Sequence, residues 1–294
     1  MALTIEYAFD EFLGRLRATP GEIAAAKSHR ASVSGKLVEA FGMTSFFRTG
    51  SFGNATNISG YSDVDYFAVI PRSRLKADSS LTLAEVAQAL RDRFPQTSNI
   101  RVNSPGVRVP FGYDGAEATE IVPVDDTGLT KLGFSQFDMP DGSGGWKFSA
   151  PESHNAYVQN IDKTLDDRVR PLIRFIKAWK YIRNVPIKSF YLEIRVAHYA
   201  STQKSILYDT DIALFLGQML NDYIADFPDP RFPNDNFLLK GCANVSDLTD
   251  AYSKLSNAAK WALEAAQHNN AGRIASAFRS WQLVYDGQFP PYGL

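Results

Sequence analysis

The sequence predicts an α+β protein whose two halves differ in character. Before about residue 145, strand-like segments bounded by Gly, Asn, Ser and Pro turns alternate with helical patterns, whereas nearly everything after it has helical spacing. Asp141–Gly145 is the most flexible stretch and marks the expected boundary. A length of 294 residues suits about two domains. We therefore expect domains at 1–145 and 146–294.

The first half begins with helices and continues with strands. Apolar residues recur at helical spacing from Ile5 to Phe41, and Pro20 divides this run into two helices. A further helix is expected at 82–94. The expected strands are 45–48, 64–70, 107–113 and 119–124.

The second half is predicted to be helical. The proline-punctuated segment 227–233 is expected to be a loop. The expected helices are 152–164, 167–183, 189–201, 210–226, 247–268 and 271–286.

Composition excludes several classes of protein. A hydrophobic fraction of 45% is enough to fill a core, and 31 basic against 32 acidic residues gives a net charge of -1. Proteins that grip long nucleic acids usually carry a basic excess, so no polynucleotide is expected to be required. The single cysteine, Cys242, excludes an intrachain disulfide and a Cys-rich zinc site. His154 and His198 are expected to be structural, because the four histidines lack metal-ligand spacing.

The N-terminus predicts a cytoplasmic location. Acidic residues stand at Glu6, Asp10 and Glu11, and no apolar run follows them, so a signal peptide is not expected. No stretch approaches 18 uncharged apolar residues, so no membrane span or membrane partner is expected.

The segment from Arg48 to Ile70 carries the chemistry. A strand leads into a Gly-Ser turn, and a second strand opens with Asp63-Val-Asp65. Alternation along a strand places both carboxylates on one side, where they repel each other. A divalent cation offsets this repulsion, since Mg²⁺ typically takes one or two carboxylates and substrate phosphate oxygens. The alternative is a turn and an Asx-rich loop that cap a solvated strand end.

Gly50 and Ser51 suit the phosphate side of the same chemistry. Glycine lets the backbone approach a phosphate closely, and the neighbouring N–H groups and the serine hydroxyl are neutral donors. The segment is not a Walker loop, because no Gly-Lys-Ser/Thr follows.

A basic stretch in the second half is a candidate triphosphate wall. Residues 168–204 hold nine basic side chains against one acid, Glu193, a local net charge of +8. Arg170, Arg174 and Lys177 have the i, i+4, i+7 spacing of one helical face, so an anion is the natural partner. A solvated basic face is the alternative.

The pattern Gly50-Ser51, Thr56 and Ser62-Asp63-Val64-Asp65 resembles the DNA-polymerase-β nucleotidyltransferase superfamily. More narrowly it resembles the bacterial cGAS/DncV-like nucleotidyltransferases (CD-NTases), relatives of oligoadenylate synthetase. The segments 119–124, 172–180 and 188–193 extend this resemblance. It implies a polymerase-β-like core of mixed sheet and flanking helices and a C-terminal helical, oligoadenylate-synthetase-like domain. The implied shape is bilobal, with the active site in the cleft.

The resemblance also implies roles for individual residues. Glu120 stands where most relatives have Asp, and Asp114, Asp125 and Asp126 are nearby substitutes for it. The residues implied to hold Mg²⁺ or Mn²⁺, as two ions, and to act in catalysis are Asp63, Asp65 and Glu120. Those implied to contact nucleotide are Gly50, Ser51, Ser62, Lys177, Ser189 and Phe190, the last by stacking on a base.

The implied reaction is attack by a ribose hydroxyl of one nucleoside triphosphate on the α-phosphate of another, with release of pyrophosphate. Its product would be a cyclic di- or trinucleotide messenger of bacterial anti-phage (CBASS) signalling, read by a downstream effector and controlled by a regulatory protein. The alternatives are a different acceptor, such as a linear oligonucleotide or an aminoglycoside, and a catalytically silent nucleotide-binding module.

Overall fold

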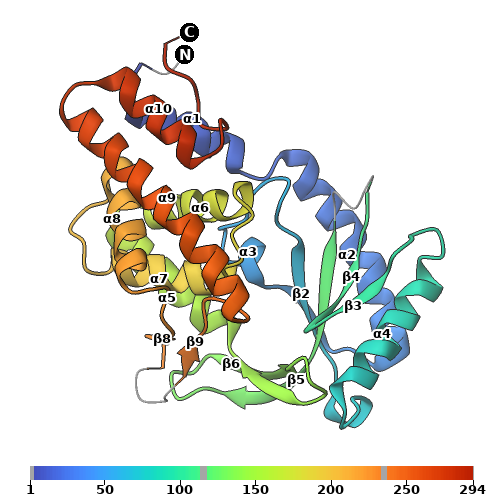
Figure 1. Ribbon diagram of the computed structural model, residues 1–294. Helices are drawn as coiled ribbons and strands as arrows, with labels where there is room; N and C mark the ends of the chain where they lie inside the picture. Colours follow the sequence, from blue (N-terminus) through green and yellow to red (C-terminus); the bar gives the residue numbers. More distant parts are fainter. Residues whose placement is uncertain (1–2, 113–117, 233–236, 294) are drawn as a thin grey trace. The chain divides into compact units, whose positions relative to one another are not determined.

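The computed structural model describes residues 3–112, 118–232 and 237–293, and its contacts divide the chain into two compact units (Figure 1). One unit, the sheet unit, is residues 18–156. The other, the helical unit, combines the residues up to Arg17 with residues 157–294. The first helix thus groups with the C-terminal part of the sequence, and the later boundary lies near residue 156, whereas the sequence predicted a division at 145.

The sheet unit is built on one mixed sheet. Its central strands follow the order β1-β2-β5-β4-β3, and β6 pairs with β5 and β7. β2 and β5 run parallel, and the other pairs are antiparallel. The strands are β1 (Ser45–Arg48), β2 (Val64–Val69), β3 (Arg101–Asn103), β4 (Gly106–Val109), β5 (Thr119–Leu129), β6 (Ser135–Pro140) and β7 (Trp146–Ser149).

Two helices, α2 (Pro20–Phe41) and α4 (Ser79–Arg93), cover one face of this sheet (Figure 1). Alternate strand residues point to this face, and they share a core with apolar residues of both helices. The strand residues of this core include Val64, Tyr66, Ala68, Val107, Val109 and Ile121. A smaller cluster on the opposite face includes Phe67, Val69, Val122, Val124 and Phe137. By the same alternation, positions 65, 108 and 120 belong to the face that α2 and α4 leave open.

The helical unit confirms the predicted run of helices. The loop predicted at 227–233 begins with the short strand β8 (Phe227–Pro228), which pairs antiparallel with β9 (Leu238–Leu239) further along the chain. Among the described residues, no helix has the length and apolar character needed to cross a bilayer. Helix α5 (Pro151–Thr164) begins in the sheet unit and continues into the helical unit. The other helices of the helical unit are α1 (Ile5–Leu16), α6 (Val169–Ile182), α7 (Ser189–Ala200), α8 (Tyr208–Asn221), α9 (Val245–Asn270) and α10 (Ile274–Val284).

Aromatic packing explains why α1 joins the helical unit. Its buried residues Ile5, Ala8, Phe9, Phe12, Leu13 and Leu16 form one helical stripe. The Phe9 ring centroid lies 5.0 Å from those of both Phe175 and Trp281. Phe12 packs edge-on against Tyr285, with the centroids 4.8 Å apart. Such pairs bury large apolar area, so the unit's core depends on the N-terminal helix.

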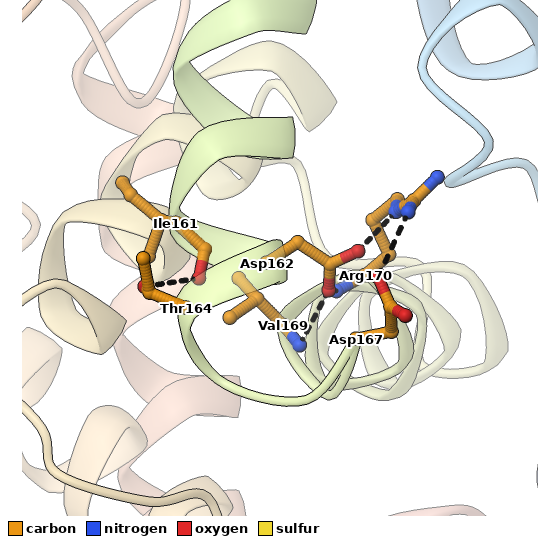
Figure 2. A network of polar contacts seen from close by, with 6 residues as sticks. All are labelled: Ile161, Asp162, Thr164, Asp167, Val169 and Arg170. Atoms are coloured by element: carbon orange, nitrogen blue, oxygen red, sulfur yellow. Dashed lines mark hydrogen bonds and ion pairs between the residues drawn. The ribbon is translucent and has the colours of Figure 1, made fainter.

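A buried carboxylate fixes the turn between α5 and α6 (Figure 2). Asp162 is fully buried, and its Oδ1 accepts hydrogen bonds from the backbone N–H groups of Val169 and Arg170, both at 2.9 Å. Its Oδ2 pairs with the Arg170 guanidinium, which also contacts Asp167 at 3.4 Å. The carboxylate therefore satisfies otherwise unpaired N–H groups at the start of α6.

Candidate active site

Two predicted carboxylates lie side by side on the open face of the sheet. The parallel register places Asp65 of β2 opposite Glu120 of β5, and the antiparallel register places Glu120 opposite Arg108 of β4. Three neighbouring strands thus present a row of acid, acid and base. Asp63 lies just before β2 and reaches the basic end of this row.

Arg108 forms a two-pronged ion pair with Asp63. Its Nε donates to Asp63 Oδ2 at 2.9 Å, and its Nη2 donates to Oδ1 at 3.3 Å. Hydrogen bonding to Asp63 raises the pKa of Arg108, so the guanidinium is firmly charged. The sequence analysis missed this residue. The sequence does contain a sign of it, because Arg108 is a single charged residue between Val107 and Val109 in a strand-like segment. Alternation along a strand places such a residue on the face away from the core.

Glu120 has a raised affinity for its proton. Burial and, after it, the nearby charge of Asp63 raise the pKa of Glu120 to about 7, although Arg108 acts in the opposite direction. The row therefore carries more negative charge than one arginine compensates. The proposed substitutes lie elsewhere, since Asp125 and Asp126 pair with β6 at Asp138 and Phe137. Asp114 falls outside the described residues.

Two glycines let the backbone come close to these carboxylates. Gly50 has a φ of +58°, and a Cβ there would lie 1.9 Å from Asp65 Oδ2. A Cβ on Gly106 would lie 2.8 Å from Cγ of Glu120 and 2.9 Å from the Ile121 carbonyl oxygen. A side chain at either position would collide with the site, so both glycines are required by space.

The Gly-Ser turn forms the short helix α3 (Gly50–Gly53), which is anchored at both ends. The Thr49 N–H donates to the Asp65 carbonyl at 2.9 Å, which ties the start of the loop to β2. At the other end, the buried Asn54 side chain lies 2.8 Å from Nε2 of buried His154, at the start of α5. His154 was expected to be structural, and this contact gives it a definite place beneath the loop.

Ser62 closes the same segment. Its hydroxyl accepts from the Ile58 N–H at 2.9 Å, and its own N–H donates to the Ile58 carbonyl at 3.0 Å. Ser62 therefore shapes the turn before Asp63, and its contact with nucleotide stays a prediction, like those of Gly50 and Ser51.

The donor chemistry of the row suits a hard divalent cation, because Asp63, Asp65 and Glu120 offer carboxylate oxygens. Their arrangement in this structure does not gather them around one point. Over residues 3–112, 118–232 and 237–293, no group of three or more His, Cys, Asp or Glu side chains is placed to hold a metal ion. One reason is visible, since Arg108 engages both oxygens of Asp63.

The other predicted nucleotide contacts belong to the helical unit. Lys177 is fully buried, and its Nζ lies 2.6 Å from Glu193 Oε1. Ser189 begins α7, and its hydroxyl lies 3.1 Å from the Tyr181 hydroxyl. The Phe190 ring is 43% exposed, and the Arg231 guanidinium lies 5.0 Å from its centroid. Their roles toward nucleotide stay predictions.

The basic stretch is more neutral than its sequence indicates. Besides the Lys177–Glu193 pair, Arg170 pairs with Asp162, Arg183 with Asp286 and Arg195 with Asp222. Three of these four acids lie outside residues 168–204, so a sum over neighbouring sequence positions overstated the local charge.

Burial also affects two basic groups of this stretch, since it lowers the pKa of Arg174, to about 10, and that of Lys180, to about 8. Arg17 and Arg170 add to the effect at Arg174, and Lys177 adds to it at Lys180.

Comparison with known proteins supports the resemblance. No family profile matches the chain. A probable cyclic nucleotide synthase of Bacillus cereus (strain VD146) is 27% identical over 179 residues, which cover 59% of this chain. The match spans about half of that relative, 52% of its length.

Solved structures match over nearly the whole chain. Vibrio cholerae DncV cyclic AMP-GMP synthase, in complex with the linear intermediate 5' pppA(3',5')pG, has a TM-score of 0.78 at 13% identity. That match covers 99% of this chain and 97% of the other. CdnC of E. coli MS115-1, in its CdnC:HORMA-deltaN complex, has a TM-score of 0.74 at 16% identity, over 97% and 98% of the chains. These likenesses establish the fold and confirm the predicted fold class.

Proposed function

We propose, from the fold that this chain shares with bacterial cGAS/DncV-like nucleotidyltransferases, that it is itself a nucleotidyltransferase acting on nucleoside triphosphates. The observation that supports this most directly is the row on the sheet. Asp65 and Glu120 stand in register, Asp63 lies beside them, and the Gly50 backbone closes against Asp65. Paired carboxylates beside a Gly-Ser turn suit phosphoryl chemistry, in which charge neutralisation and positioning do most of the work.

In this proposal the residues divide the reaction between them. Asp63, Asp65 and Glu120 would hold divalent metal ions, which supply neutralisation of phosphate charge and a lowered pKa of the attacking hydroxyl. The Gly50–Ser51 turn binds phosphate oxygens through backbone N–H groups and the serine hydroxyl. Lys177 and Ser189 contact the triphosphate, and Phe190 stacks on a base.

The product is proposed to be a cyclic di- or trinucleotide that serves as a messenger in anti-phage signalling. The curated relative is described as a probable cyclic nucleotide synthase, and the DncV complex contains a linear dinucleotide intermediate. A regulatory protein partner is proposed by analogy with CdnC, which was solved with a HORMA protein.

The test is incubation of the purified protein with all four labelled nucleoside triphosphates and Mg²⁺ or Mn²⁺, followed by mass analysis of phosphatase-resistant products. We expect a cyclic oligonucleotide and pyrophosphate without any added acceptor or DNA. Linear products, or products formed only with an added small molecule, would favour a different acceptor. Tight nucleotide binding without any product would indicate a silent binding module.

Asp65→Asn should abolish this product, because it removes one of the three carboxylates proposed to hold the metal ions. We expect a loss of at least about a thousandfold in rate, the scale of several kcal/mol of transition-state stabilisation. Asp126→Asn is the matched control on β5, since its carboxylate is exposed and caps Gly128 away from the row. Turnover by Asp65→Asn near that of the wild type would contradict the assignment.

A further inference from the structure

Arg108 is paired with Asp63, one of the carboxylates proposed to hold a metal ion. The ion pair uses both oxygens of Asp63, with donor–acceptor distances of 2.9 and 3.3 Å. Both partners are partly shielded, with 24% of the Arg108 side chain and 31% of the Asp63 side chain exposed. A two-pronged guanidinium–carboxylate pair is among the stronger polar contacts that side chains make.

The sheet itself holds Arg108 in this place. Val107 and Val109 are fully buried in the core beneath α2 and α4, so alternation directs the residue between them to the open face. The register then sets it opposite Glu120. Glycine at position 106 leaves room beside it for the Glu120 side chain.

This placement accounts for two features of the site. Without a cation, three carboxylates in and beside one row repel each other, and the guanidinium offsets part of that repulsion. While it does so, the oxygens of Asp63 are engaged, in keeping with the absence of a three-ligand group over residues 3–112, 118–232 and 237–293.

We propose that Arg108 is a built-in counter-ion that competes with a divalent metal ion for Asp63, so that metal binding requires the guanidinium to leave this carboxylate. The inference rests on the proposed function only in taking the competing cation to be a divalent metal. Metal affinity in the absence of nucleotide is then set partly by the strength of the Arg108–Asp63 pair.

The experiment measures Mn²⁺ binding to the purified full-length protein without nucleotide, by the electron paramagnetic resonance signal of free Mn²⁺. Arg108→Gln removes the charge and keeps a polar side chain of moderate length. We expect it to lower the Kd for Mn²⁺ about tenfold or more, because the contact that it removes is a charge-assisted pair. Circular dichroism verifies that each variant is folded.

Arg101→Gln is the matched control. Arg101 lies on β3 directly opposite Arg108, is exposed, and carries the same charge on the same face. At about 0.15 M salt, its loss should change the Kd less than about threefold, because exposed charges are screened. Equal tightening in both variants would show a general charge effect and overturn direct competition.

A second variant pair tests the partner. In an Asp63→Asn background, Arg108→Gln should leave the Kd for Mn²⁺ unchanged, because the carboxylate in dispute is gone. An Arg108→Gln protein that binds Mn²⁺ no better than the wild type, or not at all, overturns the inference. If the wild type forms product but Arg108→Gln has an unchanged Kd for Mn²⁺, the competition is rejected and the proposed function stands. If Arg108→Gln binds Mn²⁺ more tightly but the wild type forms no product from any nucleotide, the proposed function is rejected and the competition stands.

Discussion

Glu120 keeps its proton at pH values where an ordinary glutamate has lost it, because burial and the charge of Asp63 both penalise its ionised form. The pKa of about 7 makes this carboxyl a titrating group near neutrality. The parallel register sets Glu120 directly opposite Asp65.

The raised pKa predicts how stability depends on pH. Below about pH 4.5 Glu120 is protonated in both states, and its favourable contribution to folding is fully present. As pH rises through about 7, the unfolded state is already ionised while the folded state must give up its proton, so this contribution is lost. In the metal-free protein we expect Glu120 to lower the free energy of unfolding by on the order of 2–3 kcal/mol over this window.

Urea unfolding of wild type and Glu120→Gln across this pH range measures the effect. The free energy of unfolding of Glu120→Gln should lack this fall with pH. The control Glu39→Gln, which changes an exposed glutamate, should keep it. Parallel stability curves for wild type and Glu120→Gln would contradict the environment described for this carboxyl.

At the scale of elements, the contact between Asn54 and His154 ties the loop that contains α3 (Gly50–Gly53) to the first turn of α5 across 100 sequence positions. The loop itself is only one short helical turn, so its position depends on such anchors. His154→Ala should therefore raise the KM for nucleoside triphosphate about tenfold while changing kcat less, because it removes a buried hydrogen-bond partner of the loop.

His154→Gln, which keeps a side-chain hydrogen-bonding group, should recover part of the affinity, and His268→Ala in α9 serves as the control. Steady-state kinetics well below the unfolding temperature separate this positioning role from a loss of fold. A lower melting temperature with an unchanged KM would show that His154 contributes to stability alone.

The sequence predicted the positions of helices and strands better than it predicted which residues of different strands contact each other. Strands at 45–48 and 64–70 were found within a residue, because their β-branched and aromatic residues lie between clear turns. β6 and β7 were missed, since segments such as Ser135–Pro140 lack a regular apolar alternation. The Asp65–Glu120 proximity followed from a family resemblance, whereas the Arg108–Asp63 pair depends on a strand register that no local pattern encodes.

At the scale of the whole molecule, the two compact units do not follow chain order. Residues up to Arg17 pack with the C-terminal helices, and Ala18 begins the sheet unit. The sequence could not predict this grouping, because it rests on contacts such as Phe9 with Trp281, which lie far apart in the chain.

Phe9→Ala should therefore destabilise the helical unit. Phe9 is 1% exposed and contacts rings from three separate segments, so its truncation leaves a cavity that costs about 3–5 kcal/mol. Tyr7→Ala on the same helix is the control, because Tyr7 is exposed. Thermal unfolding followed by tryptophan fluorescence measures the effect, since Trp179, Trp261 and Trp281 belong to this unit. Equal melting temperatures for the two variants would contradict the role of α1.

The glycines at positions 50 and 106 mark the site independently of its acidic residues. Each stands where a single added carbon would overlap a carboxylate-bearing side chain, at 1.9 Å from Asp65 and 2.8 Å from Glu120. A duplicated copy of this gene released from selection would be expected to lose these positions as readily as the aspartates themselves. Among related chains, a side chain at either glycine would therefore mark a degenerate copy even where every acidic residue is retained.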